Sequence, residues 1–573
     1  MNKLCRNGFV FLLACLAAAI PAHAVVYTWT GLSNTDFNTA GNWDPVGVPN
    51  SSDDTAVIQN GLSDIGTSNT VSTLTLGGGS GSGTINLNSG GDLTASQVIQ
   101  SGTGTGTVNF NGGTITASAA STDFLSGTAN YISNGGAMVD TQSYSVTIST
   151  VLANSTLSTG GLTKQGAGKL TLTAANTYAG ATTISAGVLQ ADDGVGLPAN
   201  SLLRLDGGML QTTSAMFTRS IGTSAGNVLW TANGGGFSAG SASGLTVNIG
   251  GDNHTLVWGS DIVGTLKLSS PTAKGLVKIV NNIDLNGEDR VIEIDNSDTT
   301  QTYRGWIVGV ISNSSSTPAG IIKTGSGRLY ISTVDTYDGT TTVLQGFMAY
   351  AVLQPHGNYV VKGGTMCFCG QSPKIKGLQV TGGGVEGLGT SIVYSDTTYD
   401  IQGGELYGIT LNNGKDSLGH TIVVGLTKTG DTLAKLECTC AYTGTTTISE
   451  GTLELDTVVT IPYKDNYVGQ ISTSSPIVNN ATFLIGDTNA HTVGTISGTG
   501  TTQLNAGAKL TAASVEEGTL TIGAGATLTI AAIAGGPSSD AALLSPVPEP
   551  SALVMLAMAG LGVLLAAVRR KKR

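Results

Sequence analysis

Charged side chains are scarce in this sequence of 573 residues. Asp, Glu, Lys and Arg together make up 11% of it, against about 25% in ordinary soluble proteins. The formal net charge is −11. Seven of the 26 basic residues lie at the two ends, at Lys3, Arg6, Arg569, Arg570, Lys571, Lys572 and Arg573. We expect no nucleic-acid partner, because binding nucleic acid requires clustered Lys and Arg.

Proline is also rare, with 14 residues. Together with the lack of a Gly-X-Y period, this excludes a collagen-like chain. The mean hydropathy of +0.17 and the recurring Val, Ile and Leu exclude general disorder. Glycine is abundant, with 83 residues, and Ser, Thr and Asn fill much of the rest. This mixture is typical of β-structure with many tight turns, and the chain length favours repeats over one compact core.

The first 24 residues have the pattern of a secretory signal peptide. Lys3 and Arg6 precede an apolar run from Gly8 to Ile20, and Ala22 and Ala24 form an A-x-A site for signal peptidase. The mature chain would then begin with the residue after Ala24. The apolar run is too short to span a bilayer. A lipoprotein signal ending at Cys15 is the alternative.

The C-terminal end carries a second targeting pattern. Val547, Pro548, Glu549 and Pro550 precede eighteen apolar or small residues, 551–568, and then the basic cluster 569–573. At about 1.5 Å per residue this stretch is long enough for a single transmembrane helix, and the basic cluster would stay in the cytoplasm. This order resembles the PEP-CTERM sorting signal of Gram-negative bacteria, with 541–546 as a linker. The resemblance implies cleavage by an exosortase near residue 547 and a surface or exopolysaccharide destination.

Three segments between these ends align without gaps, at 161–190, 320–349 and 425–454. Each has a Lys fourteen residues before a Tyr, and a Gly two and nine residues after that Tyr. The lysines are Lys164, Lys323 and Lys428, and the tyrosines are Tyr178, Tyr337 and Tyr442. The segments resemble the autotransporter-associated β-strand repeat, which implies a right-handed parallel β-helix. We expect this all-β solenoid over residues 61–540, with the tyrosines packed and the lysines solvated.

The local pattern agrees with stacked strands. Leu170 and Leu172 alternate with Thr171 and Thr173, so one face is apolar and the other polar. A weaker repeat, GTINLN at 83–88 and GTVNFN at 106–111, has a period of 23 residues. Residues 25–60 differ and carry Trp29, Asn42, Trp43, Pro49, Asp53 and Asp54. We interpret them as an N-terminal cap over the first coil.

No catalytic, cofactor or metal site is predicted. The Gly166–Leu170 stretch lacks the residues of a phosphate-binding loop. The acidic pairs Asp192–Asp193 and Asp53–Asp54 are expected in solvated turns, without the clustered partners that sugar-cleaving enzymes use. His254, His356, His420 and His491 are scattered.

The four cysteines outside the signal form two C-x-C pairs. The strand phase points Cys367 and Cys369 outward and Cys438 inward, and leaves their redox state open.

The sequence therefore predicts a non-enzymatic structural or adhesive protein of the cell surface or extracellular matrix. Its expected partners are signal peptidase and exosortase, the inner membrane before cleavage, and exopolysaccharide or host glycans. The alternative is a polysaccharide lyase or glycoside hydrolase on the same β-helix scaffold.

Overall fold

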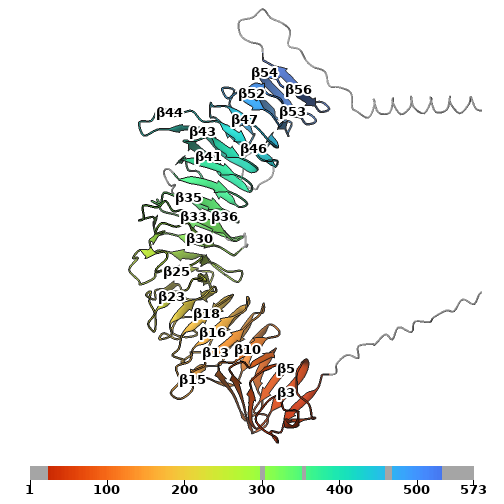
Figure 1. Ribbon diagram of the computed structural model, residues 1–573, viewed down its shortest axis with the longest axis vertical. Helices are drawn as coiled ribbons and strands as arrows, with labels where there is room; N and C mark the ends of the chain where they lie inside the picture. Colours follow the sequence, from red (N-terminus) through yellow and green to blue (C-terminus); the bar gives the residue numbers. More distant parts are fainter. Residues whose placement is uncertain (1–23, 297–303, 351–356, 458–466, 532–573) are drawn as a thin grey trace, which may run out of the picture. The chain divides into compact units, whose positions relative to one another are not determined.

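The computed structural model describes residues 24–296, 304–350, 357–457 and 467–531 (Figure 1). The described chain is almost entirely β-structure, and its one helical element there is the 3-10 turn η1 (Ala40–Asn42). The expected all-β parallel solenoid is confirmed. The chain divides into two compact units, residues 1–160 and 161–573. The signal residues 1–23 and the sorting tail lie outside the described residues.

The strands of the first unit lie in three stacked rows that are joined by parallel pairing. The first row contains β1 (Val26–Trp29), β3 (Ser51–Ile58), β5 (Ser68–Leu76), β8 (Gln97–Gln100), β11 (Ser121–Ser126) and β14 (Val146–Ile148). The second contains β7 (Asp92–Ala95), β10 (Thr114–Ala117) and β13 (Ala137–Asp140). The third is a five-stranded sheet of β4 (Gly61–Ile65), β6 (Ser82–Asn88), β9 (Thr105–Asn111), β12 (Ala129–Ile132) and β15 (Leu152–Asn154).

The 23-residue period sets the register of the third row. Gly83 pairs with Gly106, and the pairing continues through Asn88 and Asn111. A Cβ added at Gly83 would lie 1.9 Å from the Ile58 carbonyl oxygen, so the backbones meet there too closely for any side chain. The predicted repeat of these two segments is therefore one coil stacked on the next.

An aromatic cluster lies at the start of the first unit. Trp43, from β2 (Trp43–Asp44), is 1% exposed and its ring lies 4.9 Å from Trp29 and 4.8 Å from Phe37. Its indole N–H donates to the Phe37 carbonyl oxygen at 2.8 Å. Asn42 is fully buried, and its amide oxygen accepts the Ser33 N–H at 2.9 Å. These contacts fix the chain between β1 and β3.

The second unit repeats the same stacking in long parallel rows. One begins with β16 (Leu162–Gln165), β18 (Thr182–Ile184), β20 (Leu203–Leu205) and β23 (Val228–Trp230). The next contains β17 (Lys169–Leu172), β19 (Val188–Gln190), β21 (Met209–Thr212), β24 (Gly235–Ala239), β27 (Leu266–Leu268), β30 (Arg290–Glu293), β33 (Ile321–Thr324), β35 (Thr340–Val343), β37 (Asn358–Val361), β40 (Gly377–Val380), β42 (Tyr399–Ile401), β45 (Leu426–Lys428), β47 (Thr446–Ile448), β50 (Ile477–Asn479), β52 (Ala490–Ser497), β54 (Lys509–Glu516) and β56 (Thr527–Ile530).

A further row contains β22 (Met216–Phe217), β25 (Leu245–Val247), β28 (Val277–Ile279), β31 (Gly305–Ile307), β34 (Arg328–Ile331), β36 (Phe347–Tyr350), β38 (Thr365–Cys367), β41 (Gly384–Ser395), β43 (Gly404–Lys415), β46 (Leu433–Cys440), β48 (Thr452–Leu455), β51 (Thr482–Ile485), β53 (Thr501–Leu504) and β55 (Thr519–Ile522). Short strands complete the unit: β26 (Leu256–Val257), β29 (Ile283–Asp284), β32 (Ile311–Ser312), β39 (Lys374–Ile375), β44 (Thr421–Ile422) and β49 (Gln470–Ile471). Among all the named strands, β1–β2 and β43–β44 are the antiparallel pairs.

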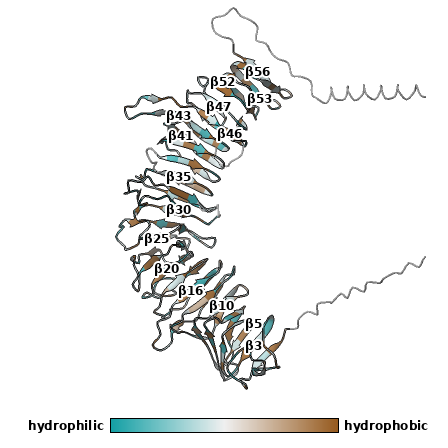
Figure 2. Cartoon of the chain, viewed as in Figure 1, coloured by the Kyte–Doolittle hydropathy of each residue, from teal (hydrophilic) through white to brown (hydrophobic). Residues whose placement is uncertain are grey.

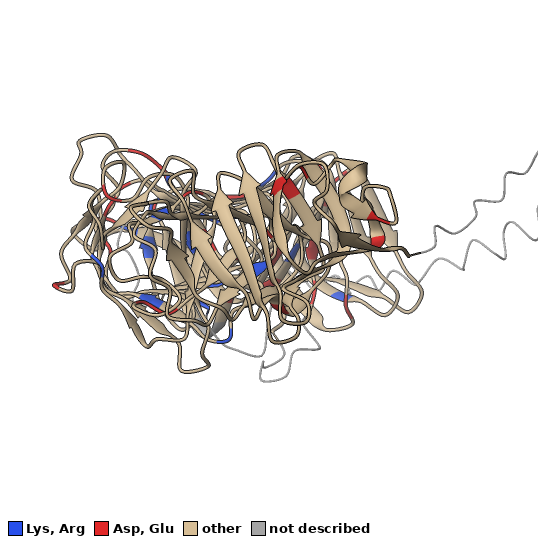
Figure 3. Cartoon of the chain, turned by 90° about the horizontal axis from the view of Figure 1, so that it is seen from below, with Lys and Arg blue, Asp and Glu red and all other residues tan. Residues whose placement is uncertain are grey.

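The core follows the alternation predicted from the sequence. Leu170 and Leu172 are buried, whereas Thr171 and Thr173 point away from the core and are partly exposed or exposed. The same alternation of apolar and polar residues is visible along many strands (Figure 2). Charged residues are few along the described chain (Figure 3), so stacking of apolar side chains between coils is the main stabilising contribution.

Candidate functional site

The three repeats share one buried arrangement around their lysines. Lys164, Lys323 and Lys428 are each 0% exposed, so the prediction that these lysines are solvated is wrong. The Lys164 ammonium donates to the carbonyl oxygens of Gln165 at 2.6 Å, Gly166 at 2.7 Å and Ala186 at 3.2 Å. Lys323 and Lys428 repeat this set of three acceptors with distances between 2.6 and 3.1 Å.

The geometry explains why a lysine is needed there. Two of the three carbonyls belong to the turn that follows the strand, and the third belongs to the stacked turn of the next coil. Gly166 has a φ of 76° and Gly187 a φ of 60°, conformations that favour glycine. Three ammonium protons match three convergent carbonyls. Burial nevertheless lowers the pKa of Lys323 to about 7.

The repeat tyrosines are buried, as predicted. The hydroxyls of Tyr178, Tyr337 and Tyr442 lie 2.7, 2.5 and 2.8 Å from a threonine hydroxyl four residues later. In the first repeat the chain of hydrogen bonds continues through Ser201 to the Gly180 carbonyl oxygen. The lysines and tyrosines therefore hold stacked turns together.

A second cluster, on the outward side of four stacked strands, was not predicted. We call it the acidic ladder: Glu386 from β41, Glu405 and Tyr407 from β43, Lys435 and Glu437 from β46, Glu454 from β48, and the adjoining Asp456. The Tyr407 hydroxyl donates to Glu386 at 2.5 Å. Lys435 lies 2.8 Å from Asp456 and 3.7 Å from Glu454. The ladder thus holds five carboxylates and one ammonium group, which pairs with Asp456 and Glu454.

Burial and mutual repulsion change the proton affinities in this ladder. Glu437 is 8% exposed, and burial, followed by the charge of Glu405, raises its pKa to about 7, with Lys435 opposing. Burial also raises the pKa of Glu454, against the effect of Lys435. The ladder can therefore both hold and release a proton near neutral pH.

The raised pKa of Glu437 predicts a pH dependence of stability. The folded chain binds a proton at Glu437 below about pH 7, whereas the unfolded chain binds it only below about pH 4.3. Stability should therefore rise as the pH falls through 7, by on the order of 1 kcal/mol after solvent screening. Glu437→Gln should flatten the dependence of the melting temperature on pH over about pH 5–8. The control Glu516→Gln, at an exposed position, should keep the wild-type profile, and an unchanged slope in Glu437→Gln would contradict the assignment.

The acidic pairs singled out from the sequence have structural partners. Asp192 accepts hydrogen bonds from the Thr212 hydroxyl and the Thr213 N–H, both at 2.7 Å. Asp193 pairs with buried Arg219 at 2.6 Å. Asp53 and Asp54 lie within β3, and Asp54 is 7% exposed, so the expectation of solvated turns is wrong for that pair. Neither pair lies in the acidic ladder.

The histidines stay apart, although one of them is structural. His491 is buried, with its ring nitrogens 2.8 Å from the Gly469 carbonyl oxygen and 2.7 Å from Asp487. His254 and His420 contact nearby aspartates at the surface. His356 lies outside the described residues.

The two C-x-C pairs are in different states. Cys367 and Cys369 form a disulfide with a Cα–Cα separation of 5.1 Å. Cys369 has a φ of 35°, which is the chain bend that brings the two residues together. Cys367 pairs with Glu386 in the outward row, as the phase predicted, but is fully buried. Cys438 and Cys440 are buried thiols, which agrees with the predicted inward phase of Cys438.

The processing residues proposed from the sequence lie largely outside the described chain. The residues outside it are Ala22, Val547, Pro548, Glu549, Pro550, Arg569, Arg570, Lys571, Lys572 and Arg573, together with the predicted span 551–568. Ala24 is described and exposed. Within the described ranges, the chain contains no helix with the length and apolar character needed to cross a membrane.

Two known families match parts of the chain. The passenger-associated-transport-repeat matches residues 162–191, 321–348 and 426–455. The PEP-CTERM protein-sorting motif matches residues 546–572. The chain thus carries three transport repeats and one sorting motif, as the sequence indicated, and it is an exported, surface-sorted β-solenoid protein.

One relative is an adhesin. The adhesin BmaC autotransporter of Brucella suis biovar 1 (strain 1330) is 28% identical over 297 residues, which cover 50% of this chain and 7% of that protein. The chain therefore spans a small part of that relative's length and is distantly related to it. No solved structure matches the chain.

Proposed function

We propose that this protein is a non-enzymatic structural or adhesive component of the cell surface or extracellular matrix of a Gram-negative-type bacterium. The observation that carries the proposal is the combination of three transport repeats with one sorting motif in a single chain. The interior supports it, because the repeat lysines and tyrosines bind the chain's own backbone and hydroxyls. A solenoid of this kind presents a long polar surface while its core only stacks coils.

The proposed maturation has two cuts. Signal peptidase removes residues 1–24, and an exosortase cuts near residue 547 after the apolar span 551–568 has held the chain in the inner membrane. We further propose that the solenoid is right-handed and that residues 25–60 form its N-terminal cap. The aromatic packing of Trp29, Phe37 and Trp43 supports the cap, because an uncovered first coil would expose apolar side chains and strand edges.

Glu549→Ala should abolish surface sorting. The sorting motif matches residues 546–572, and the proposed recognition by an exosortase depends on the Pro-Glu-Pro segment that contains Glu549. We expect the variant to accumulate uncut in the inner membrane, whereas Asp540→Ala, which removes the same charge upstream of the motif, should reach the surface. Cell fractionation and mass spectrometry of the C-terminus measure this. A surface form of the wild-type chain that retains Arg573 would refute sorting by cleavage.

The acidic ladder favours a second candidate, a polysaccharide lyase or glycoside hydrolase. Its carboxylates come from neighbouring coils, and Glu437 has the raised pKa of a proton donor. The structural proposal requires that the purified protein release no reducing or unsaturated sugars from polysaccharides. Release that disappears in Glu437→Gln would establish the enzyme instead.

A further inference from the structure

The first unit has no basic side chain outside the signal segment. From Val25 to Gly160 the sequence contains no Lys, Arg or His and no Glu, but eight Asp residues. A surface with this charge repels anions, and no side chain of the segment can neutralise a carboxylate, sulfate or phosphate. The composition of this part of the protein therefore favours an uncharged or cationic ligand over an anionic one.

The outward face of the five-stranded sheet carries a row of amides that ends at an aromatic ring. The register places Asp64, Asn86, Asn109, Tyr131 and Ala153 side by side on successive strands. Asn86 donates to Asp64 and Asn109 donates to Asn86, both at 2.8 Å. Because the amides all donate toward β4, the Asn109 amide oxygen is the last acceptor of the row, and Tyr131 is its neighbour on β12.

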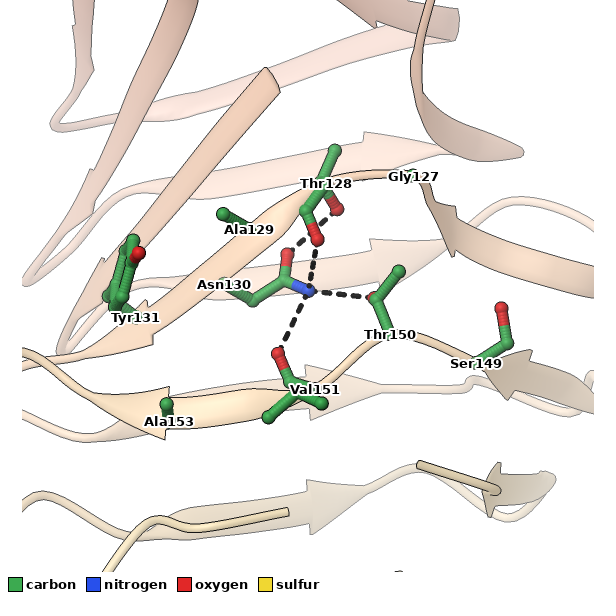
Figure 4. A pocket seen from close by; sticks show the side chains of 9 residues that line it. All are labelled: Gly127, Thr128, Ala129, Asn130, Tyr131, Ser149, Thr150, Val151 and Ala153. Carbon is green, nitrogen blue, oxygen red and sulfur yellow. Dashed lines mark hydrogen bonds between the residues drawn. The ribbon is translucent and has the colours of Figure 1, made fainter. Parts of the chain in front are cut away.

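An open hollow of about 420 Å³ lies beside Tyr131 (Figure 4). The side chains of Ala129 and Ala153, on neighbouring strands, are small and leave room beside the ring. Tyr131 is 40% exposed and Val151 is 44% exposed. The hollow is lined by residues 127–131, 149–151 and 153.

The walls of the hollow are held from within. Asn130 is 2% exposed, and its amide N–H groups donate to the Thr150 hydroxyl at 2.7 Å and to the Thr128 carbonyl oxygen at 3.2 Å. The Thr128 hydroxyl donates to the Asn130 amide oxygen at 2.9 Å. These bonds tie β12 to the chain entering β15 (Figure 4), so the exposed side chains on the other side of the strand are preorganised.

We propose that this hollow, together with Tyr131 and the amide row, binds a neutral polysaccharide. This inference rests on the adhesive role proposed above and names its ligand class. The Tyr131 ring offers an apolar face to the C–H groups of a sugar ring at a small entropic cost. The Asn109 amide oxygen accepts hydrogen bonds from sugar hydroxyls. The lack of any cation from Val25 to Gly160 selects against acidic polysaccharides.

The test uses the full-length chain and affinity electrophoresis on a panel of neutral polysaccharides (a β-glucan, a mannan and a galactan), with polygalacturonate as the acidic comparison. We expect retardation by at least one neutral polymer and none by polygalacturonate, with little change at about 0.5 M salt. Tyr131→Ala should weaken binding about tenfold or more. Tyr144→Ala removes a tyrosine of similar exposure, 37%, away from the hollow and should bind like the wild type.

Three outcomes would overturn the inference: no retardation by any neutral polymer, equal binding by Tyr131→Ala and the wild type, or salt-sensitive binding to polygalacturonate or to a basic protein. Melting temperatures of both variants establish that the fold is intact. Asn109→Ala, which removes the last amide acceptor of the row beside Tyr131, gives a second readout and should also weaken binding. Failure here with normal surface sorting would reject this ligand and leave the proposed function standing.

Discussion

Replacing Leu170 with Asp should unfold the coils around it, whereas Thr171→Asp should leave them folded. Leu170 is 0% exposed between stacked coils, so the variant both loses apolar burial and places an unpaired charge in the core. Such changes destabilise by about 4 kcal/mol or more. Thr171 points outward and is only partly exposed, and we expect an effect within about 0.5 kcal/mol there.

Thermal melting and hydrogen exchange measure this pair. In a stacked solenoid each coil contacts only its neighbours, so loss of protection should centre on β17 and β19, which pair with each other. Equal loss of protection in the two variants would contradict the assigned strand phase.

Lys164→Met should be nearly as damaging, although it replaces a charged residue by an apolar one of similar length. The variant removes the charged donor from the carbonyl oxygens of Gln165, Gly166 and Ala186, which lie in partly buried turns. Losing a hydrogen bond to a charged group costs about 1–3 kcal/mol, so we expect a loss of about 3 kcal/mol or more for the three bonds. Lys169→Met is the matched control, because Lys169 is partly exposed and donates to the Gln190 side chain at 3.0 Å.

Hydrogen exchange separates the effect of the lysine from general destabilisation. In Lys164→Met the amides of the two stacked turns, near Gly166 and Gly187, should lose protection first. If Lys164→Met and Lys169→Met melt alike, the buried ammonium is not what holds these turns.

The sequence predicted the features that depend on local period. Leu170 and Thr171 were predicted to face opposite sides of one strand. The 23-residue spacing of Gly83 and Gly106 corresponds to a direct pairing of these residues between stacked coils. Both follow from the alternation of a strand and the constant length of a coil. The matched repeats likewise follow from fixed spacing.

The buried lysines were missed for an identifiable reason. A single lysine in a polar, Gly-rich segment is usually solvated, and nothing in its own strand shows that carbonyls of the next coil converge on it. A glycine follows each repeat lysine by two residues, at Gly166, Gly325 and Gly430, and all three have a positive φ. This glycine is the signal that could have revealed the buried lysines, because the turn that it forms directs carbonyls toward the preceding side chain.

The acidic ladder could not be predicted at all. Glu386, Tyr407, Glu437 and Asp456 are separated by unequal numbers of residues, since the intervening loops differ in length. Which of them share a row depends on the register between β41, β43 and β46, including an irregular pairing after Tyr407. The ladder therefore results from tertiary register and not from a motif.

The absence of Lys and Arg from residues 25–160 also affects how proteases cleave the protein. Trypsin-like enzymes cut after Lys or Arg, and from Val25 to Thr163 they find neither. The first cation after the signal segment is Lys164, whose side chain is fully buried and held by three carbonyls. This segment is thus immune to such enzymes by composition, even when it is unfolded, and the next available site is protected by folding. A trypsin digest of the native protein should release the segment only as part of a larger fragment.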